Sequence, residues 1–164
     1  MQGNNMGRQR VDEGLIDQRA CAEVAEPPRQ VRLLPEAAKA ITGAMHAASP
    51  QEGCGLLGGY RDLDTVIAAY LPLANQHPTA DGFAIDPVMF LRASTDLERR
   101  GLAVVGFVHS HPNGTTAPSE RDCASAWRHT VQLIAAPTAD GRCPISAFWF
   151  ADARFARIPL VTPE

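Results

Sequence analysis

The fold is decided by the stretch Ala103-Val-Val-Gly-Phe-Val-His-Ser-His-Pro-Asn-Gly-Thr-Thr-Ala-Pro-Ser-Glu-Arg-Asp122. It begins with a continuous apolar run, which is typical of a strand buried on both faces. A turn-rich loop follows, and the residues from Ser119 to Asp122 match the start of a helix. The stretch therefore predicts a central strand whose end faces a loop and the first turn of a helix.

Two histidines and one aspartate in this stretch are the residue types of a metal site. His109 and His111 stand two apart at the end of the predicted strand, and such residues point to the same face of an extended backbone. Asp122, in the first helical turn, can supply a third ligand. Two imidazoles and a carboxylate suit a catalytic zinc with one position open for water, which ionises there near neutral pH.

A structural role explains part of the same pattern. Ser119-Glu-Arg-Asp122 also matches the Ser-x-x-acid sequence of a capping box, so both residues can be purely structural. The two histidines favour a metal site, because burying both without a partner costs free energy. The residues alone leave the metal site and the helix cap both open.

Length and composition are those of a single-domain globular protein. The chain has 164 residues, of which 45% are apolar and 20% charged. A formal charge of -3 and a pI near 5.9 argue against a nucleic-acid-binding face. No apolar run approaches the ~20 residues that a membrane span needs. We therefore expect neither a nucleic acid nor a membrane as a partner, and the oligomeric state stays open.

The N-terminal segment is polar. Met1 to Arg8 has no apolar region typical of a secretory signal, so we expect a cytoplasmic protein. In that reducing compartment the four cysteines, which form no Cys-x-x-Cys pair, are expected to be free thiols. Residues 1–30 are interpreted as a flexible tail that ends in a Pro-Pro linker, and residues 31–164 as the compact domain.

Helices and strands are interleaved on both sides of the central strand. The predicted strands cover 31–34, 53–59, 65–73, 83–85, 103–108 and 131–135, followed by a closing hairpin of 145–150 and 154–160. The predicted helices cover 36–48, 87–100 and 119–129. This order favours an α/β (α+β) single domain in which helices flank a mixed sheet.

The second of these helices carries clear boundary signals. Asp86 precedes it as an N-cap, and Gly101 follows it as a C′ residue. The apolar spacing predicts that Val88, Leu91 and Leu97 face the core.

The opening stretch resembles the JAMM (MPN+) metalloprotease motif, which is His-x-His-Pro followed by Ser-x-x-Asp. The matching residues are His109, His111, Pro112, Ser119 and Asp122. Gln51-Glu-Gly-Cys-Gly-Leu-Leu-Gly-Gly59 resembles the family's glutamate-bearing strand, and Phe83-Ala-Ile-Asp-Pro87 resembles the strand-to-helix junction of small prokaryotic members. The resemblance covers residues 31–150 and implies a cytidine-deaminase-like, MPN-type architecture with one zinc ion per chain.

The resemblance also implies a role for each residue. His109, His111 and Asp122 would be the zinc ligands. Glu52 would take a proton from the attacking water and pass it to the leaving amine, and Ser119 would donate a hydrogen bond to the tetrahedral intermediate. The implied activity is zinc-dependent hydrolysis of an amide bond at the C-terminal tail of a ubiquitin-like or sulfur-carrier protein.

Phe83 and Ile85 are the predicted substrate-binding residues. The loop Asn75–Asp81 and the strand Gly82–Ile85, which contains both residues, match the place where family members hold an extended substrate tail, which can bind as an added strand. The predicted strand at 131–135 follows the motif helix at once, which leaves no room for the long inserted loop of larger eukaryotic deubiquitinases. The resemblance is therefore to a minimal, prokaryotic-type member.

Three alternatives remain. Cys54 is a conceivable nucleophile, although a buried small residue is the simpler interpretation. Another zinc hydrolase, the base deaminase, is disfavoured because its His-x-Glu and Pro-Cys-x-x-Cys patterns are missing from the sequence. A non-catalytic MPN-type scaffold or interaction module would typically lose zinc ligands, whereas this chain keeps all three together with Glu52.

Overall fold

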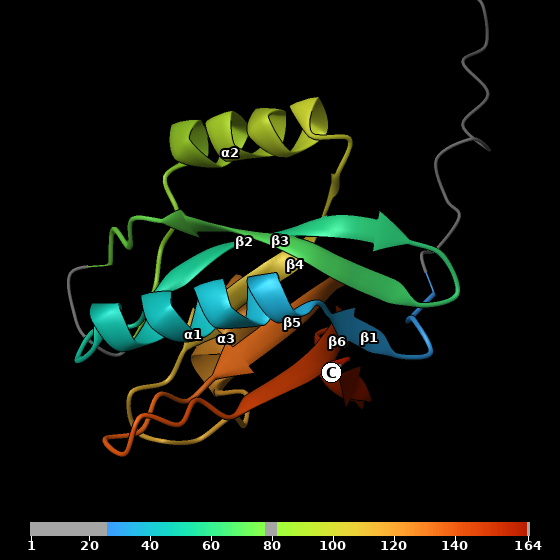
Figure 1. Cartoon of the computed structure of the whole chain (residues 1–164). Helices are drawn as coiled ribbons and strands as arrows, with labels where there is room; N and C mark the ends of the chain where they lie inside the picture. The colour runs from blue at the N-terminus through green and yellow to red at the C-terminus, as the bar shows by residue number, and fades with distance from the viewer. Residues whose placement is uncertain (1–25, 78–81, 164) are drawn as a thin grey trace, which may run out of the picture.

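The computed structural model describes residues 26–77 and 82–163. In these ranges an eight-stranded mixed sheet is flanked by helices, as predicted for an α/β fold (Figure 1). The helices are α1 (Pro35–Ala48), α2 (Pro87–Arg99) and α3 (Glu120–Ser125). The strands are β1 (Val31–Leu33), β2 (Cys54–Arg61), β3 (Thr65–Leu73), β4 (Ala103–Ser110), β5 (Thr130–Ala135), β6 (Ile145–Ala151), β7 (Arg154–Ile158) and β8 (Leu160–Val161).

Most of the predicted N-terminal tail lies outside the described residues, which include only 26–30 of it. In this part the Arg29 N–H donates to the Leu63 carbonyl at 2.9 Å, and the Gln30 side-chain amide donates to the Asp64 carboxylate at 2.7 Å. These bonds hold the end of the segment against the turn between β2 and β3. None of the helices within 26–77 and 82–163 is long and apolar enough to cross a membrane.

The predicted central strand lies in the middle of the sheet. The strand order is β7-β6-β5-β4-β2-β3-β1-β8, so β4 is flanked by β2, which is antiparallel to it, and by β5, which is parallel. β4 is buried from Val105 to its end at Ser110, two residues past the predicted end. The strand therefore carries its apolar run, and then polar side chains, to one end of the sheet.

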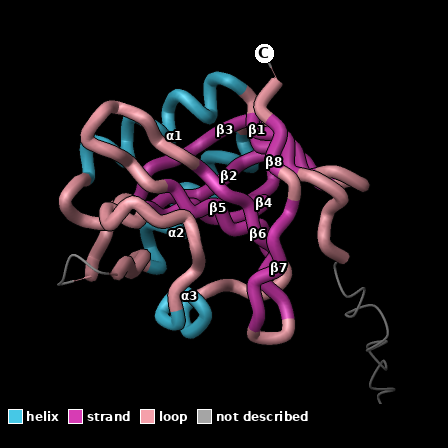
Figure 2. Tube along the Cα trace, turned by 90° about the horizontal axis from the view of Figure 1, so that it is seen from below, coloured by secondary structure: helices cyan, strands magenta, loops and turns pink. Residues whose placement is uncertain are grey.

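The predicted closing hairpin is confirmed by the antiparallel pair of β6 and β7, but its second strand ends at Ile158, because Pro159 separates β7 from β8. β7 pairs with β6 at one edge of the sheet, and β8 pairs with β1 at the other. Because β8 directly follows β7 in the chain, the sheet curls until its two edges approach (Figure 2). Proline has no N–H for a strand ladder, and here its carbonyl accepts the Val31 N–H at 2.8 Å.

The two longer helices cover opposite faces of the sheet. α1 buries Ile41 in the cluster that contains Leu57, whereas α2 buries Leu97 in the cluster that contains Leu56. Since neighbouring residues of a strand point to opposite faces, α1 and α2 lie on either side of β2 (Figure 1). The sheet is thus covered on both faces at β2, the neighbour of β4.

The predicted inward face of α2 is partly wrong. Leu97 is fully buried as predicted, but Val88 and Leu91 are 56% and 64% exposed. The inward stripe instead contains Met89, Ala93 and Leu97, which are four residues apart. Leu91 stands two residues from the stripe, about 200° around a helix of 3.6 residues per turn, and therefore faces away from the sheet.

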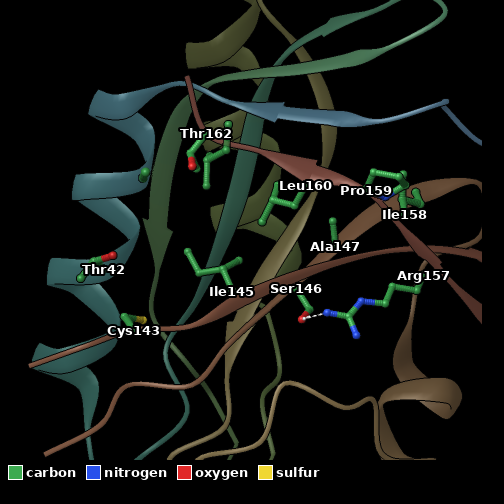
Figure 3. A pocket seen from close by; sticks show the side chains of 12 residues that line it. Thr42, Cys143, Ile145, Ser146, Ala147, Arg157, Ile158, Pro159, Leu160 and Thr162 are labelled. Atoms are coloured by element: carbon green, nitrogen blue, oxygen red, sulfur yellow. Dashed lines mark hydrogen bonds between the residues drawn. The ribbon is translucent and has the colours of Figure 1, made fainter. Parts of the chain in front are cut away.

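A cavity of about 750 Å³ lies between α1 and strands β6 to β8 (Figure 3). On its wall Arg157 donates to the Ser146 hydroxyl at 3.3 Å, and that hydroxyl also contacts Thr116 of the motif loop at 2.8 Å. None of the predicted site residues lines this cavity. This cavity is therefore separate from the predicted chemistry.

Candidate metal centre

Both histidines lie at the C-terminal end of β4. His109 pairs in register with Cys54 of β2 and Ile134 of β5, while the N–H of His111 donates to the Ala135 carbonyl at 2.8 Å. Their side chains are buried, with residue exposures of 1% and 5%, and the two Nε2 atoms are 3.1 Å apart. Because residues i and i+2 of an extended strand point to the same face, the two imidazole rings lie side by side.

Asp122 reaches this point from the first turn of α3. The Ser119 hydroxyl accepts the Asp122 N–H at 3.2 Å, and the Asp122 Oδ2 accepts the Ser119 N–H at 2.6 Å, which completes a capping box. The carboxylate so oriented places Oδ1 3.2 Å from His109 Nε2 and Oδ2 3.2 Å from His111 Nε2. The helix cap and the approach to the histidines therefore coexist in one side chain.

α3 is much shorter than the predicted helix over 119–129. It ends at Ser125, because Ala126 is extended with ψ of 139°. The next residue, Trp127, packs its ring 4.8 Å from Phe90 and 5.0 Å from Phe107. This packing takes the chain away from the helix axis, which the local sequence did not indicate.

The three side chains fit a zinc ion. Their potential ligand atoms lie within 4.8 Å of one another. The two Nε2 atoms are 3.1 Å apart, and each lies 3.2 Å from a carboxylate oxygen of Asp122. A tetrahedral zinc with ligand bonds of about 2.0–2.1 Å places its ligand atoms about 3.3–3.4 Å apart. Two imidazole nitrogens and one carboxylate are also the donor set of catalytic zinc sites, which keep a fourth position open.

The pKa shifts of His109 and Asp122 suit a bound cation, whereas that of His111 runs the other way. Burial lowers the pKa of His109 despite the opposing hydrogen bond to Asp122, and neutral imidazole is the form that binds metals. Burial acts in the same direction on His111, but Asp122 and the charge of Glu52 outweigh it and raise that pKa. In Asp122, burial is outweighed by the two histidine hydrogen bonds, which hold the carboxyl pKa well below its usual range. The carboxylate is therefore ionised at neutral pH.

Glu52 lies beside the histidines although it is distant in sequence. It is only 8% exposed, and it lines an open cavity of about 630 Å³ together with His111 and Ser119. The residue after it, Gly53, donates its N–H to the buried Ser110 hydroxyl at 2.8 Å. A buried carboxylate next to a candidate metal site and an open cavity is well placed for proton transfer.

The predicted substrate-binding segment lies against the ring of His109. The Phe83 ring stacks on the His109 ring with a centroid distance of 4.6 Å. The expected strand over 83–85 is reduced to one antiparallel bridge, between Ile85 and Asn75. Phe83 and Ile85 line an apolar cavity of about 270 Å³, whose aromatic walls are Phe90, Phe107 and Trp127. This segment therefore runs directly past the candidate metal centre.

Cys54 is unsuited to act as a nucleophile. Its buried Sγ lies 3.6 Å from the Leu73 carbonyl, and burial together with the charge of Glu52 raises its pKa to about 11. The reactive form of cysteine is the thiolate, so Cys54 is protonated and inert near neutral pH. The cysteines in the described residues, Cys54, Cys123 and Cys143, are free as predicted, and Cys21 lies outside these residues.

The sequence analysis did not find the supporting hydrogen bonds of two residues, Ser110 and Asn75. Ser110 stands between the two histidines, but strand alternation turns it to the opposite face, where it binds Gly53. The Asn75 amide binds the carbonyls of Glu52 and Gly82, each at 2.9 Å. The resemblance places Asn75 in the loop of 75–81, of which 78–81 lie outside the described residues, but it does not indicate these bonds, because the partners come from other segments.

Comparison with known proteins places this geometry in a family. Residues 35–151 match the family described as prokaryotic homologs of the JAB domain. A probable TtuB-protein conjugate cleaving protease of Thermus thermophilus is 43% identical over 49% of this chain and 53% of its own length. A desampylase of Haloferax volcanii is 38% identical over 57% of this chain and 66% of its own. The human deubiquitinase MYSM1 is 38% identical over 62% of this chain but only 12% of its own. The chain thus matches less than two thirds of each of these relatives.

Solved structures agree with the match. Protein DSY2949 of Desulfitobacterium hafniense superposes with a TM-score of 0.75 at 26% identity, over 82% of this chain and 94% of that chain. A protein of Salinibacter ruber shares the fold, with a TM-score of 0.60 at 24% identity over 81% of this chain and 92% of its own. Since the family match covers most of the chain, the protein belongs to the prokaryotic JAB family of JAMM/MPN-type domains.

Proposed function

We propose that this protein is a zinc-dependent peptidase that hydrolyses an amide bond at the C-terminal tail of a ubiquitin-like or sulfur-carrier protein. The observation that carries the proposal is the convergence of His109, His111 and Asp122 beside the buried carboxylate of Glu52. The names of the similar proteins, a conjugate cleaving protease, a desampylase and a deubiquitinase, support the same class of substrate.

The residues divide the work of hydrolysis. A zinc ion held by His109, His111 and Asp122 would supply a Lewis acid and lower the pKa of water. Glu52 accepts a proton from the attacking water while the new C–O bond forms, and it then delivers that proton to the nitrogen as the C–N bond breaks. Ser119 uses its oxygen to cap α3 and keeps its own hydrogen, which can be donated to the developing oxyanion.

The substrate tail would bind along the segment that contains Phe83 and Ile85. The backbone of Ala84 is bonded on one side, because its carbonyl accepts the Gln76 N–H at 2.9 Å and its N–H donates to Asn75 Oδ1 at 3.0 Å. Since backbone groups alternate in direction along a strand, those of Phe83 and Ile85 face the other way, where a peptide can add as a strand. A Gly-Gly tail suits this path, because glycine lets its backbone pass close to the metal.

The metal content and one substitution test the proposal. The purified protein is expected to hold one zinc per chain and to cleave a ubiquitin-like protein whose Gly-Gly tail carries a C-terminal extension, as followed by mass spectrometry. Glu52→Gln should keep the zinc and lower kcat by about 10²–10⁴-fold, because it removes the proton carrier. Glu120→Gln is the matched control, since Glu120 lines the same cavity but is exposed.

Two results would contradict the proposal. Protein that takes up no stoichiometric zinc would favour the scaffold or interaction module instead. Full activity in Glu52→Gln, or in enzyme stripped of metal by a chelator, would remove Glu52 or the metal from the reaction.

A further inference from the structure

The side chain of Asn75 joins three separate segments of the chain. Its Nδ2 donates to the carbonyls of Glu52 and Gly82, each at 2.9 Å. Its Oδ1 accepts the N–H of His77 at 2.8 Å and that of Ala84 at 3.0 Å. A carboxamide has two donor hydrogens and two acceptor lone pairs, so all four are used.

These bonds connect the proposed proton carrier to the proposed substrate strand. On one side Asn75 holds the backbone of Glu52, which lines the same cavity as His111. On the other it holds the backbone at Gly82 and Ala84, on both sides of Phe83, which stacks on His109. A shift of either segment is therefore passed to the other through one amide group.

We infer that Asn75 is a positioning residue that couples the placement of Glu52 to that of the strand that receives the substrate tail. The inference rests on the proposed function for its catalytic consequence, but the hydrogen bonds themselves do not depend on it. No other residue type has the same length and the same bonds: aspartate lacks both donors, and glutamine is longer by one methylene.

Asn75→Asp separates the two halves of this amide. The variant keeps an acceptor for His77 and Ala84, but it loses both donors and places carboxylate oxygens against the carbonyls of Glu52 and Gly82. We expect kcat/KM to fall about 10- to 100-fold, because displacement of a catalytic group by about 1 Å has effects of that size. Zinc content should not change, because the four hydrogen bonds of the Asn75 side chain go to backbone groups of other residues than the three proposed ligands.

A double variant distinguishes positioning from general damage. If Asn75 acts on kcat through Glu52, Asn75→Asp should lower kcat little further when Glu52→Gln is already present. Independent losses that multiply in the double variant would overturn the inference. Gln76→Ala is the control, because this neighbour is exposed and bonds to Ala84 through its backbone.

Hydrogen exchange tests the same inference without substrate. In zinc-loaded Asn75→Asp, amide exchange should become faster in residues 82–86 and stay unchanged in β4 and β5. If exchange in 82–86 and kcat both match the wild type, the inference is wrong. If this local opening appears but the wild type cleaves no tail substrate, the proposed function fails while the structural coupling stands.

A second variant covers the case in which Asn75→Asp does not fold. Ala84→Pro removes one exposed N–H that Asn75 Oδ1 accepts, and it leaves Asn75 and Glu52 intact. We expect faster exchange in the neighbouring amides and a KM raised by about tenfold, as for a loosened substrate strand. An unchanged KM would contradict the role of this bond in substrate placement.

Discussion

Replacing Ser110 with alanine removes one buried oxygen and tests how the segment of Glu52 is held. Ser110 is fully buried, and its Oγ accepts the N–H of Gly53 at 2.8 Å. The alanine leaves this N–H without its partner, which costs about 1–3 kcal/mol of unfolding free energy. In a domain of this size each kcal/mol lowers Tm by about 2–4 °C, so we expect Tm to fall by about 2–12 °C.

The same substitution should reduce turnover while the metal stays bound. Gly53 directly follows Glu52, so a looser Gly53 lets the carboxylate move from its place beside the histidines. We expect kcat to fall about tenfold or more. The zinc content should not change, because strand alternation turns Ser110 to the face opposite His109 and His111.

Thermal unfolding, metal analysis and kcat of Ser110→Ala measure these effects on the zinc-loaded protein. Ser94→Ala is the control, because it also removes a hydrogen bond between a serine hydroxyl and the backbone. The Ser94 hydroxyl donates to the Leu91 carbonyl at 3.0 Å, and this bond is exposed. This control should stay within about 0.5 kcal/mol of the wild type. If Ser110→Ala keeps the wild-type Tm and kcat, the reasoning is refuted. If this variant loses zinc, the conclusion that Ser110 lies on the opposite face of the strand from His109 and His111 is wrong.

Two further predictions concern the substrate strand and the buried thiol. Ile85→Lys should raise KM for a tail substrate by about tenfold or more, because it places a charge in an apolar cavity. Val88→Lys is the control at an exposed position and should leave KM unchanged. Equal KM values in the two variants would contradict the proposed path of the tail. Because its pKa is raised to about 11, Cys54 is protonated at pH 8. Iodoacetamide should therefore modify exposed Cys123 before Cys54, which it should reach only as the pH approaches 11 or on unfolding. Rapid modification of Cys54 at pH 8, detected by peptide mass spectrometry, would oppose this assignment.

The parts of the fold that the sequence predicted well depend on local patterns. The apolar run before His109 identified β4, and the proline after Asp86 marked the start of α2. The cap formed by Ser119 and Asp122 was also visible, because both of its hydrogen bonds lie within one turn.

The parts that were missed depend on distant partners. α3 ends early because Trp127 packs against aromatic residues of α2 and β4, which no local propensity indicates. The predicted strand over 154–160 ran through Pro159, and nothing local indicated that β8 would join β1 at the opposite edge. Asn75 and Ser110 bind backbone groups of remote segments, so their residue types alone did not distinguish them from ordinary polar residues.

The capping box and the candidate metal site share one atom, the Asp122 Oδ2, which links folding to chemistry. α3 has six residues, and a helix so short is not stable in water without tertiary support. Its support comes from Asp122, whose Oδ2 accepts the Ser119 N–H while both carboxylate oxygens lie 3.2 Å from a histidine nitrogen. A cation bound by Asp122 and the histidines would therefore also hold α3 against β4, and with it the Ser119 hydroxyl. Because one carboxylate ends the loop, starts the helix and faces the histidines, the helix cap is part of the site and does not compete with it as an explanation.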